Sequence, residues 1–121
     1  MTEPLTVGVE EEFHLVDPQT RTLVNDADAV LAQLTDAGEN RFELEIKQSM
    51  IETATAVCAS LADIRRNITQ LRERLVEGAE RVDRQVIACG TAPLGHWRDG
   101  ALTPDDRYER IVELHQQVVW E

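Results

Sequence analysis

The chain is poor in aromatic residues, cysteine, lysine and long apolar runs. Aromatic residues make up only 4% of the 121 positions, and Lys47 is the single lysine beside eleven arginines. No run is apolar enough to span a bilayer, and the N-terminal residues Met1–Pro4 lack the basic and apolar regions of a signal peptide. Cys58 and Cys89 do not have metal-ligand spacing, which indicates unpaired thiols. We therefore expect a cytoplasmic protein with no membrane partner.

Positive charge is also scarce. Twelve basic residues face 23 acidic ones, so the formal net charge is −11. Nucleic acids and anionic membranes repel such a surface, which argues against both as partners. A plain acidic, soluble surface explains this charge, while an acidic protein can still bind nucleotide phosphates when a divalent metal lies between them.

The polar and apolar pattern alternates between strands and helices. Leu5–Val16 reads as a strand with an apolar face and a polar face, and Glu11 is the exception because it falls on the apolar face. This exception indicates a bulge, an edge position or the end of burial. Further strands are expected at Thr22–Val24, Arg41–Met50 and Gln85–Cys89.

Helices are expected between these strands. One begins at Asn25 or Asp26 and stops at Gly38. A second, Leu61–Val82, has Ser60 as its N-cap and an apolar stripe typical of core packing, with coiled-coil pairing as the alternative. A third opens at Thr103-Pro104-Asp105-Asp106, with Thr103 as N-cap, and its pattern continues to the last residue. We therefore expect residues 1–121 to be a segment of a longer protein, with the cut falling within this helix.

The sequence Gly8-Val-Glu-Glu-Glu-Phe13 places acids inside the first strand. Glu10 and Glu12 are two residues apart on a strand, so their carboxylates lie on one face about 7 Å apart. Such a pair suits Mg²⁺, which prefers oxygen ligands and keeps phosphates as partners, whereas a solvent-facing acidic strand is the plainer interpretation. Glu52 reaches this pair if its strand is a neighbour, and His14 is a further candidate ligand or an ordinary hydrogen-bonded histidine.

Four segments together resemble a known family. They are Thr6–Asp17 (TVGVEEEFHLVD), Gln48–Cys58 (QSMIETATAVC), Cys89–Trp97 (CGTAPLGHW) and Asp105–Glu113 (DDRYERIVE). In this order and spacing they resemble the N-terminal part of the carboxylate–amine ligases related to glutamate–cysteine ligase, the bacterial type-2 group. The resemblance covers essentially all 121 residues, which makes the chain a single N-terminal segment of a larger catalytic domain.

The resemblance implies an α+β fold, similar to glutamine synthetase, in which helices pack on one face of a mixed, largely antiparallel sheet. It implies ATP and Mg²⁺ as cofactors, and an amide formed from glutamate and cysteine or another amine through an acyl phosphate. The metal and cofactor ligands would be Glu10, Glu12 and Glu52. Thr91, Arg107 and Tyr108 are candidate substrate contacts, although Arg107 and Tyr108 can equally support their helix. The catalytic residues stay unknown, and a homo-oligomer stays open.

Two departures from the family pattern limit what is carried over. Ala92 stands where the family loop has a histidine, so no role passes to that position. The family's histidine-rich strand and later acids fall beyond Glu121, so we expect this segment alone to be inactive. Two other classes therefore remain as alternatives. One is a truncated, non-catalytic metal-binding or interaction domain, and the other is an acidic scaffold that uses the Leu61–Val82 helix as its interface.

Overall fold

The computed structural model describes residues 3–34, 41–92, 94–96 and 98–116. Four strands form one antiparallel sheet in the order β2-β3-β1-β4, so the predicted α+β class is confirmed. The likeness to glutamine synthetase stays a prediction. The elements along the chain are β1 (Glu10–Val16), α1 (Ala27–Leu31), β2 (Phe42–Leu44), β3 (Met50–Ala54), α2 (Leu61–Glu80), β4 (Gln85–Ala88) and α3 (Asp106–Leu114).

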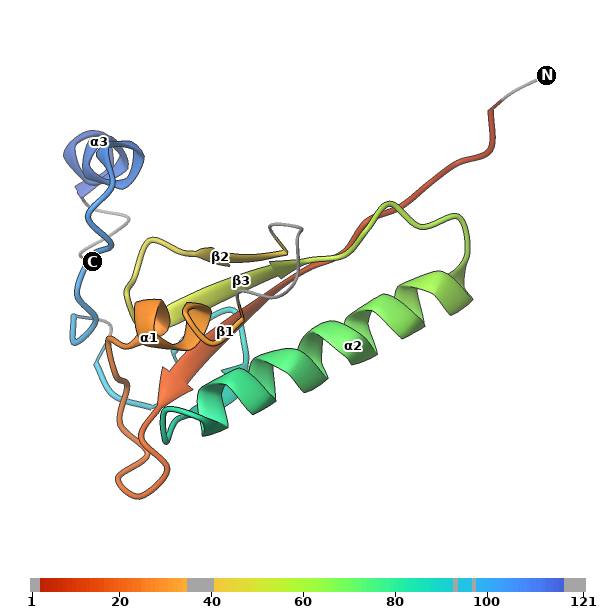
Figure 1. The fold of residues 1–121 in the computed structure, drawn as a ribbon. Coiled ribbons are helices and arrows are strands. Elements are labelled where there is room, and N and C mark those ends of the chain that lie inside the picture. The colour runs from red at the N-terminus through yellow and green to blue at the C-terminus, as the bar shows by residue number, and fades with distance from the viewer. Residues whose placement is uncertain (1–2, 35–40, 93, 97, 117–121) are drawn as a thin grey trace.

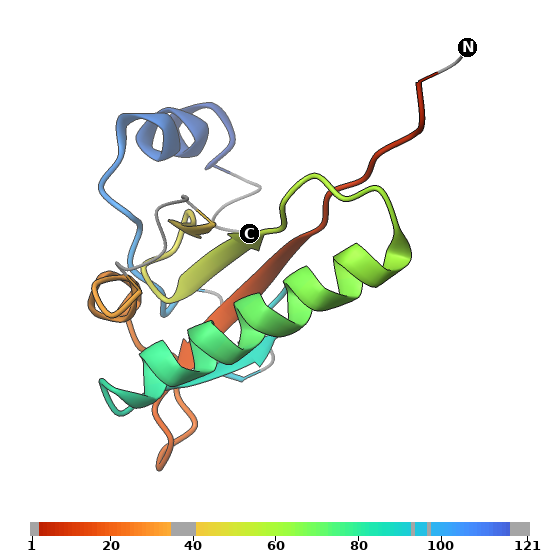
Figure 2. The same ribbon diagram turned by 45° about the vertical axis from the view of Figure 1, so that its right-hand side comes forward.

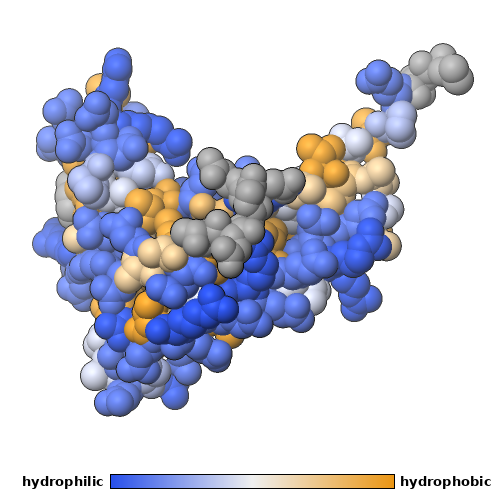
Figure 3. Space-filling model, viewed as in Figure 1, coloured by the Kyte–Doolittle hydropathy of each residue, from blue (hydrophilic) through white to orange (hydrophobic). Residues whose placement is uncertain are grey.

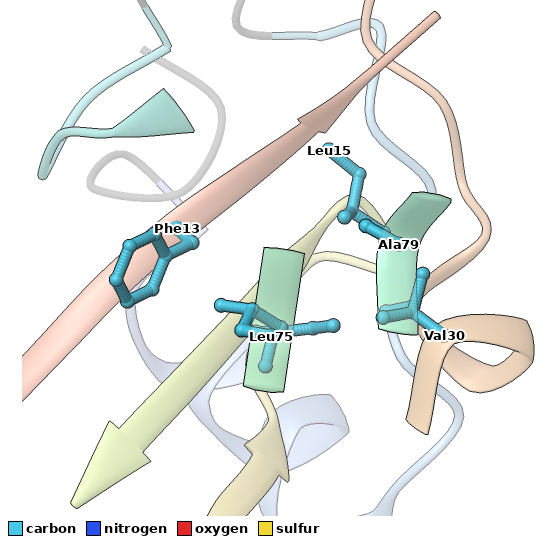
Figure 4. Close-up of a cluster of buried hydrophobic side chains, with 7 residues drawn as sticks. Phe13, Leu15, Val30, Leu75 and Ala79 are labelled. Atoms are coloured by element: carbon cyan, nitrogen blue, oxygen red, sulfur yellow. The ribbon is translucent and has the colours of Figure 1, made fainter. Parts of the chain in front are cut away.

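The core lies between one face of the sheet and the helices α1 and α2 (Figure 4). Phe13 and Leu15 of β1 point toward Leu75 and Ala79 of α2, and Val30 of α1 closes the cluster. Since side chains alternate along a strand, the other face of β1 carries Glu10, Glu12 and His14. The alternation in the sequence therefore predicted the core face of this strand.

β1 begins later than the sequence pattern suggests. The predicted strand started at Leu5, whereas the ladder with β3 begins at Glu10. At Val9 the ladder is interrupted, because the Val9 N–H donates to the Thr55 hydroxyl at 2.9 Å rather than to a backbone carbonyl. Pairing continues through the Thr55 N–H, which donates to the Val9 carbonyl at 2.9 Å, and through an isolated bridge between Val7 and Cys58. The side chains of Leu5 and Val7 are nevertheless exposed, so this arm adds little to the core.

The predicted strand Arg41–Met50 is wrong, because this segment bends in the middle. β2 ends at Leu44 and β3 begins at Met50, and the two strands form an antiparallel hairpin in which Glu43 is the register partner of Glu52. The bend is held locally, since the Glu45 carboxylate accepts from the Ile46 N–H at 2.7 Å. The alternation of apolar and polar residues continues through this bend, so the periodicity of the sequence could not reveal the bend.

α2 is the best-predicted element. Ser60 is its N-cap, with its hydroxyl accepting from the Asp63 N–H at 3.2 Å. Leu71, Leu75 and Ala79 are buried against the sheet, so the stripe is core and not a coiled-coil seam, and the scaffold alternative gains no support. Leu61, predicted to belong to this stripe, is exposed because the first turn of α2 extends past the sheet (Figure 1).

The turn after α1 comes close to α2 at Gly78. A Cβ at this position would lie 2.7 Å from Cδ2 of Leu34, so glycine permits the approach. Asp26 precedes α1 as its N-cap, within the predicted start, but the helix ends at Leu31, before the predicted stop at Gly38, which lies outside the described residues. The predicted strand Thr22–Val24 is reduced to an isolated bridge between Leu23 and Val16, in which the Val24 N–H donates to the Leu15 carbonyl and the Asp17 N–H to the Thr22 carbonyl.

α3 begins two residues later than predicted. Its N-cap is Asp105, whose carboxylate accepts from the Arg107 N–H at 2.7 Å. Thr103 is instead buried, and its hydroxyl and N–H donate to the carbonyls of Glu45 and Ile46. The helix ends at Leu114, earlier than the predicted continuation, and residues 117–121 lie outside the described part.

α2 runs along one face of the sheet, and α3 lies on the opposite side of the strands (Figure 2). The N-terminal arm extends away from the body, and apolar side chains gather where it leaves (Figure 3). In the described part of the chain, no helix is both long enough and apolar enough to cross a membrane.

Candidate functional site

The sheet brings carboxylates from three strands into one row. Glu12 of β1 is the register partner of Glu52 of β3, and Glu52 is in turn the partner of Glu43 of β2. Residues that face each other across a ladder share a face, so these side chains all lie on the face opposite α2. Glu10 lies on the same face two residues from Glu12. We call this surface the acidic face, defined by Glu10, Glu12, Glu43 and Glu52.

Glu52 has the most perturbed carboxyl group of this face. Burial raises the pKa of Glu52, and a hydrogen bond with Glu45 together with the charges of Glu45, Glu10 and Glu43 raises it further, to about 7. A carboxylate surrounded by like charges holds a proton unless a cation replaces it. The acidic face thus contains a group that a bound cation would help to ionise.

A groove of about 550 Å³ runs along the edge of this face. Glu10, Glu12 and Glu52 line it from the acidic face, and Ala88, Cys89 and Gly90 line it from the end of β4 and the loop that follows. Glu11 and Arg72 also line the groove, where it passes the edge of β1 toward the core face. β4 pairs only with Phe13–Val16, so in the described residues Glu10–Glu12 have no ladder partner on this side. The three glutamates singled out from the sequence therefore lie along one open groove.

Glu11 has a different role from its two neighbours. It lies on the core face of β1, and its carboxylate forms an ion pair with the Arg72 guanidinium of α2, with Nε 3.0 Å from Oε2. This contact lies where the apolar core ends, which agrees with one of the three interpretations of Glu11 in the sequence. The run Glu10-Glu11-Glu12 is thus divided between a structural ion pair and the acidic face.

The carboxylates of the acidic face are the right chemical type of ligand for Mg²⁺, but they are not yet arranged as a metal site. Carboxylate oxygens are the ligands that this cation takes, and the raised pKa of Glu52 reflects a cluster of like charges that a cation would relieve. Within the described ranges, however, no three acidic, histidine or cysteine residues are grouped as a metal site. Glu52 would have to exchange its hydrogen bond with Glu45 for a metal contact.

A second cavity, of about 400 Å³, lies beside the groove over the covered part of the same sheet face. Its walls are mostly apolar and come from the sheet, the loops and α3: His14, Leu23, Ile46, Lys47, Ser49, Gly90, Thr91, Ala92, Gly100 and Ile111. We call it the His14 cavity. His14 is only 4% exposed, and burial lowers the pKa of the imidazole. Neither ring nitrogen has a hydrogen-bond partner within the part of the chain that the structure describes.

The predicted substrate contacts separate into two groups. Thr91 is exposed and lines the His14 cavity together with Ala92, where the family loop has a histidine. Tyr108 is buried, and its hydroxyl donates to the Leu44 carbonyl at 2.9 Å, which anchors α3 to β2. Arg107 is exposed, with its guanidinium 5.0 Å from the centre of the Tyr108 ring. Both residues line a separate groove that also contains Pro104 and Asp105.

Sequence reasoning missed two participants. Glu45 was not among the predicted ligands, whereas the structure places it outside β2 and in hydrogen-bond contact with Glu52. Lys47 was noted only as the single lysine, but its ammonium donates to the Gly100 carbonyl at 3.1 Å and burial lowers its pKa. Both residues lie in the bend between β2 and β3, which the alternation concealed.

Comparisons with known proteins agree with the resemblance in the sequence. A protein of Rhodopirellula baltica is 35% identical over 118 residues, covering 93% of this chain and 32% of its own length. One of Roseiflexus is 34% identical over 95% of this chain and 30% of its own length, and one of Jannaschia is 38% identical over 91% and 29%. All three carry the name "Putative glutamate--cysteine ligase 2".

These names place the chain in a family of ligases. Residues 6–121 match the family described as glutamate-cysteine ligase family 2. The chain belongs to this family. It spans about a third of the length of the curated relatives that it matches.

Proposed function

We propose that this chain supplies part of the active site of an ATP-dependent carboxylate–amine ligase. The reaction joins glutamate to cysteine or another small amine, through phosphorylation of a glutamate carboxylate by ATP and attack of the amine. Family membership supports the ligase class. The observation that carries the site is the pairing of Glu12 with Glu52 beside Glu10, on a groove open enough for a ligand.

In this proposal Glu10, Glu12 and Glu52 hold Mg²⁺ and, through it, the phosphates of ATP. When bound, the metal would neutralise charge on the transferred phosphoryl group. The chain contributes a fixed row of carboxylates, since Glu12 and Glu52 lie on adjacent strands at the centre of the sheet. Glu52 would release its proton on binding the metal, because a nearby cation favours the ionised form.

The test compares Glu12→Gln with Glu11→Gln in the intact natural gene product that contains this chain. The two residues are adjacent and identical and both line the groove, but only Glu12 lies on the acidic face, whereas Glu11 is held by its ion pair with Arg72. We expect Mg²⁺-dependent ADP release in the presence of glutamate and an amine to fall about a hundredfold or more in Glu12→Gln. Glu11→Gln should retain most of this activity.

Equal ADP release in the two variants would contradict the metal assignment. Mg²⁺ binding that depends on Glu12, without any ADP release, would instead favour the non-catalytic metal-binding alternative. Isothermal titration with Mg²⁺ alone separates these outcomes, because it measures the metal site without requiring the reaction.

A further inference from the structure

The His14 cavity has the composition of a small-molecule site. Its volume of about 400 Å³ falls within the range of ligand pockets, and Leu23, Ile46, Ala92 and Ile111 give it apolar walls. None of the described residues that line it carries a carboxylate, in contrast to the neighbouring groove. A polyanion such as a metal-bound triphosphate suits the acidic groove, whereas an apolar body suits this cavity.

His14 gives the cavity a hydrogen-bonding group that the fold itself does not use. Among the described residues neither ring nitrogen has a hydrogen-bond partner, although most buried polar groups in proteins are hydrogen-bonded. The side chain lines the cavity, but less than 1 Å² of each nitrogen is exposed, so a ligand meets the nitrogens only when the imidazole turns toward the cavity. Such a turn costs the protein none of the hydrogen bonds in its described part, and it lets the imidazole accept a hydrogen bond from a bound molecule.

The charges around the cavity give a ligand a preferred direction. Gly90 lines both the cavity and the acidic groove, so the two spaces adjoin at this residue. His14 and Glu12 lie two residues apart on the same face of β1, about 7 Å along the strand. A cationic end is attracted toward the carboxylates, while Lys47 in the cavity wall disfavours the reverse orientation.

We propose that the His14 cavity binds the amine substrate of the ligase, and that this substrate is a primary amine with an uncharged, apolar body. The amine nitrogen lies at the Gly90 side, donates a hydrogen bond to His14 and points toward the acidic groove. The apolar body occupies the space between Leu23, Ile46 and Ile111. This assignment of the substrate class rests on the proposed ligase function.

Binding is measured by NMR of the intact natural protein with ¹⁵N-labelled histidine. The signal that disappears in His14→Leu is assigned to the His14 ring, whatever the number of histidines in the intact protein. Three probes separate the two parts of the proposal. Benzylamine has both the amine and the apolar body, ethanolamine lacks the apolar body, and benzyl alcohol lacks the amine. We expect benzylamine to shift the His14 signal saturably and to bind about tenfold or more tightly than either of the others.

Two variants test the site from different sides. His14→Leu removes the acceptor and should weaken benzylamine binding about tenfold. Ala92→Leu fills the cavity while leaving His14 in place, and should also weaken binding. His115→Leu is the matched control, because His115 is exposed after the end of α3 and should leave the affinity unchanged.

No saturable shift of His14, or equal affinity in His14→Leu, would overturn the proposal, as would equal binding of ethanolamine or benzyl alcohol. Failure of the ligase function looks different. Benzylamine would then bind at His14 as expected, but no Mg²⁺-dependent ADP release would accompany any amine. ADP release without benzylamine binding at His14 would overturn the cavity assignment alone.

Discussion

At the scale of single residues, His14 and Glu52 are the two titratable side chains that the surrounding fold disturbs most plainly. Both lie on the same sheet face, and each is held in a state that costs stability. The His14 ring is buried without a side-chain hydrogen bond to any described residue, and Glu52 is crowded by other carboxylates. Residues that reduce stability in this way are typical of functional sites, and each leads to a measurable prediction.

Replacing His14 by leucine should stabilise the protein. The change removes a buried group with unsatisfied nitrogens and adds apolar contact in a mostly apolar cavity. We expect the free energy of unfolding to rise by about 1–3 kcal/mol, the cost of a buried unsatisfied polar group. Urea unfolding at pH 8 measures it. A loss of stability in His14→Leu would show that the imidazole has a structural partner.

Glu52 should make stability fall with rising pH. Its pKa is about 7 in the folded state and near 4.5 in the unfolded chain, so between these values the folded state holds the extra proton. The stabilisation from that proton is complete below about pH 4.5 and is lost as pH rises through 7. In Glu52→Gln this loss is absent, so the variant should gain stability relative to the natural protein from pH 5 to 8.

This pH effect is measured by urea unfolding in buffer that contains a chelator, since a bound cation would displace the proton. Glu113→Gln is the control, because Glu113 is exposed on α3. If the natural protein and the Glu52→Gln variant showed the same pH dependence of stability, the raised pKa of Glu52 would be contradicted. In a separate measurement without chelator, added Mg²⁺ should stabilise the natural protein more than the variant.

At the scale of elements, α2 contributes Leu75 and Ala79 to the core cluster, and the two ends of the helix differ in burial. Leu75 is fully buried in the cluster with Phe13, Leu15 and Ala79, whereas Leu61 is exposed beyond the sheet. Leu75→Ala should cost about 2–5 kcal/mol of unfolding free energy, as buried leucines usually do. Leu61→Ala should change it by less than about 0.5 kcal/mol. Thermal and urea unfolding of both variants measure this difference.

A large loss of stability in Leu61→Ala would mean that the first turn of α2 packs against something in solution. Equal, small effects in both variants would mean that the stripe is not the core. The two variants thus also test the scaffold alternative. If α2 were an interface, Leu75→Ala would leave the unfolding free energy of the chain unchanged and would weaken binding to a partner instead.

The elements also show how far local sequence patterns reach. The pattern of α2 and the core face of β1 could be predicted, because a period of 3.6 or 2 is maintained over many residues. The hairpin between β2 and β3 could not, since its bend depends on the Glu45 carboxylate and on contacts with Leu102 and Thr103 more than fifty residues away. Thr103 lost its predicted capping role to these same contacts.

The candidate site follows the same rule. Glu10 and Glu12 share a face by spacing alone, and Glu52 joins them only through the register of β1 with β3, which the sequence could state as a condition but not derive. The Glu11–Arg72 ion pair and the contact of Glu45 with Glu52 depend on how distant elements pack. His14 was a candidate ligand by position, but its burial without partners is visible only in the structure.

At the scale of the whole molecule, the sheet divides the chain into two sides of different character. The helices α1 and α2 close an apolar core on one side, and the other side carries the acidic face and the His14 cavity beneath α3 and its preceding loop. The acidic residues behind the net charge of −11 are therefore not evenly distributed over the surface, since four of them form the acidic face.

The short fourth strand has a consequence for how molecules of this protein meet one another. Because β4 is short, the backbone of Glu10–Glu12 has no ladder partner on that side among the described residues. The other edge of the sheet is β2, which carries Glu43. Exposed strand edges can pair with a second chain and cause aggregation, which charged side chains oppose. Both borders of this sheet carry glutamate. The same carboxylates that suit a cation thus also keep copies apart, and acidification that neutralises them should promote fibrous self-association.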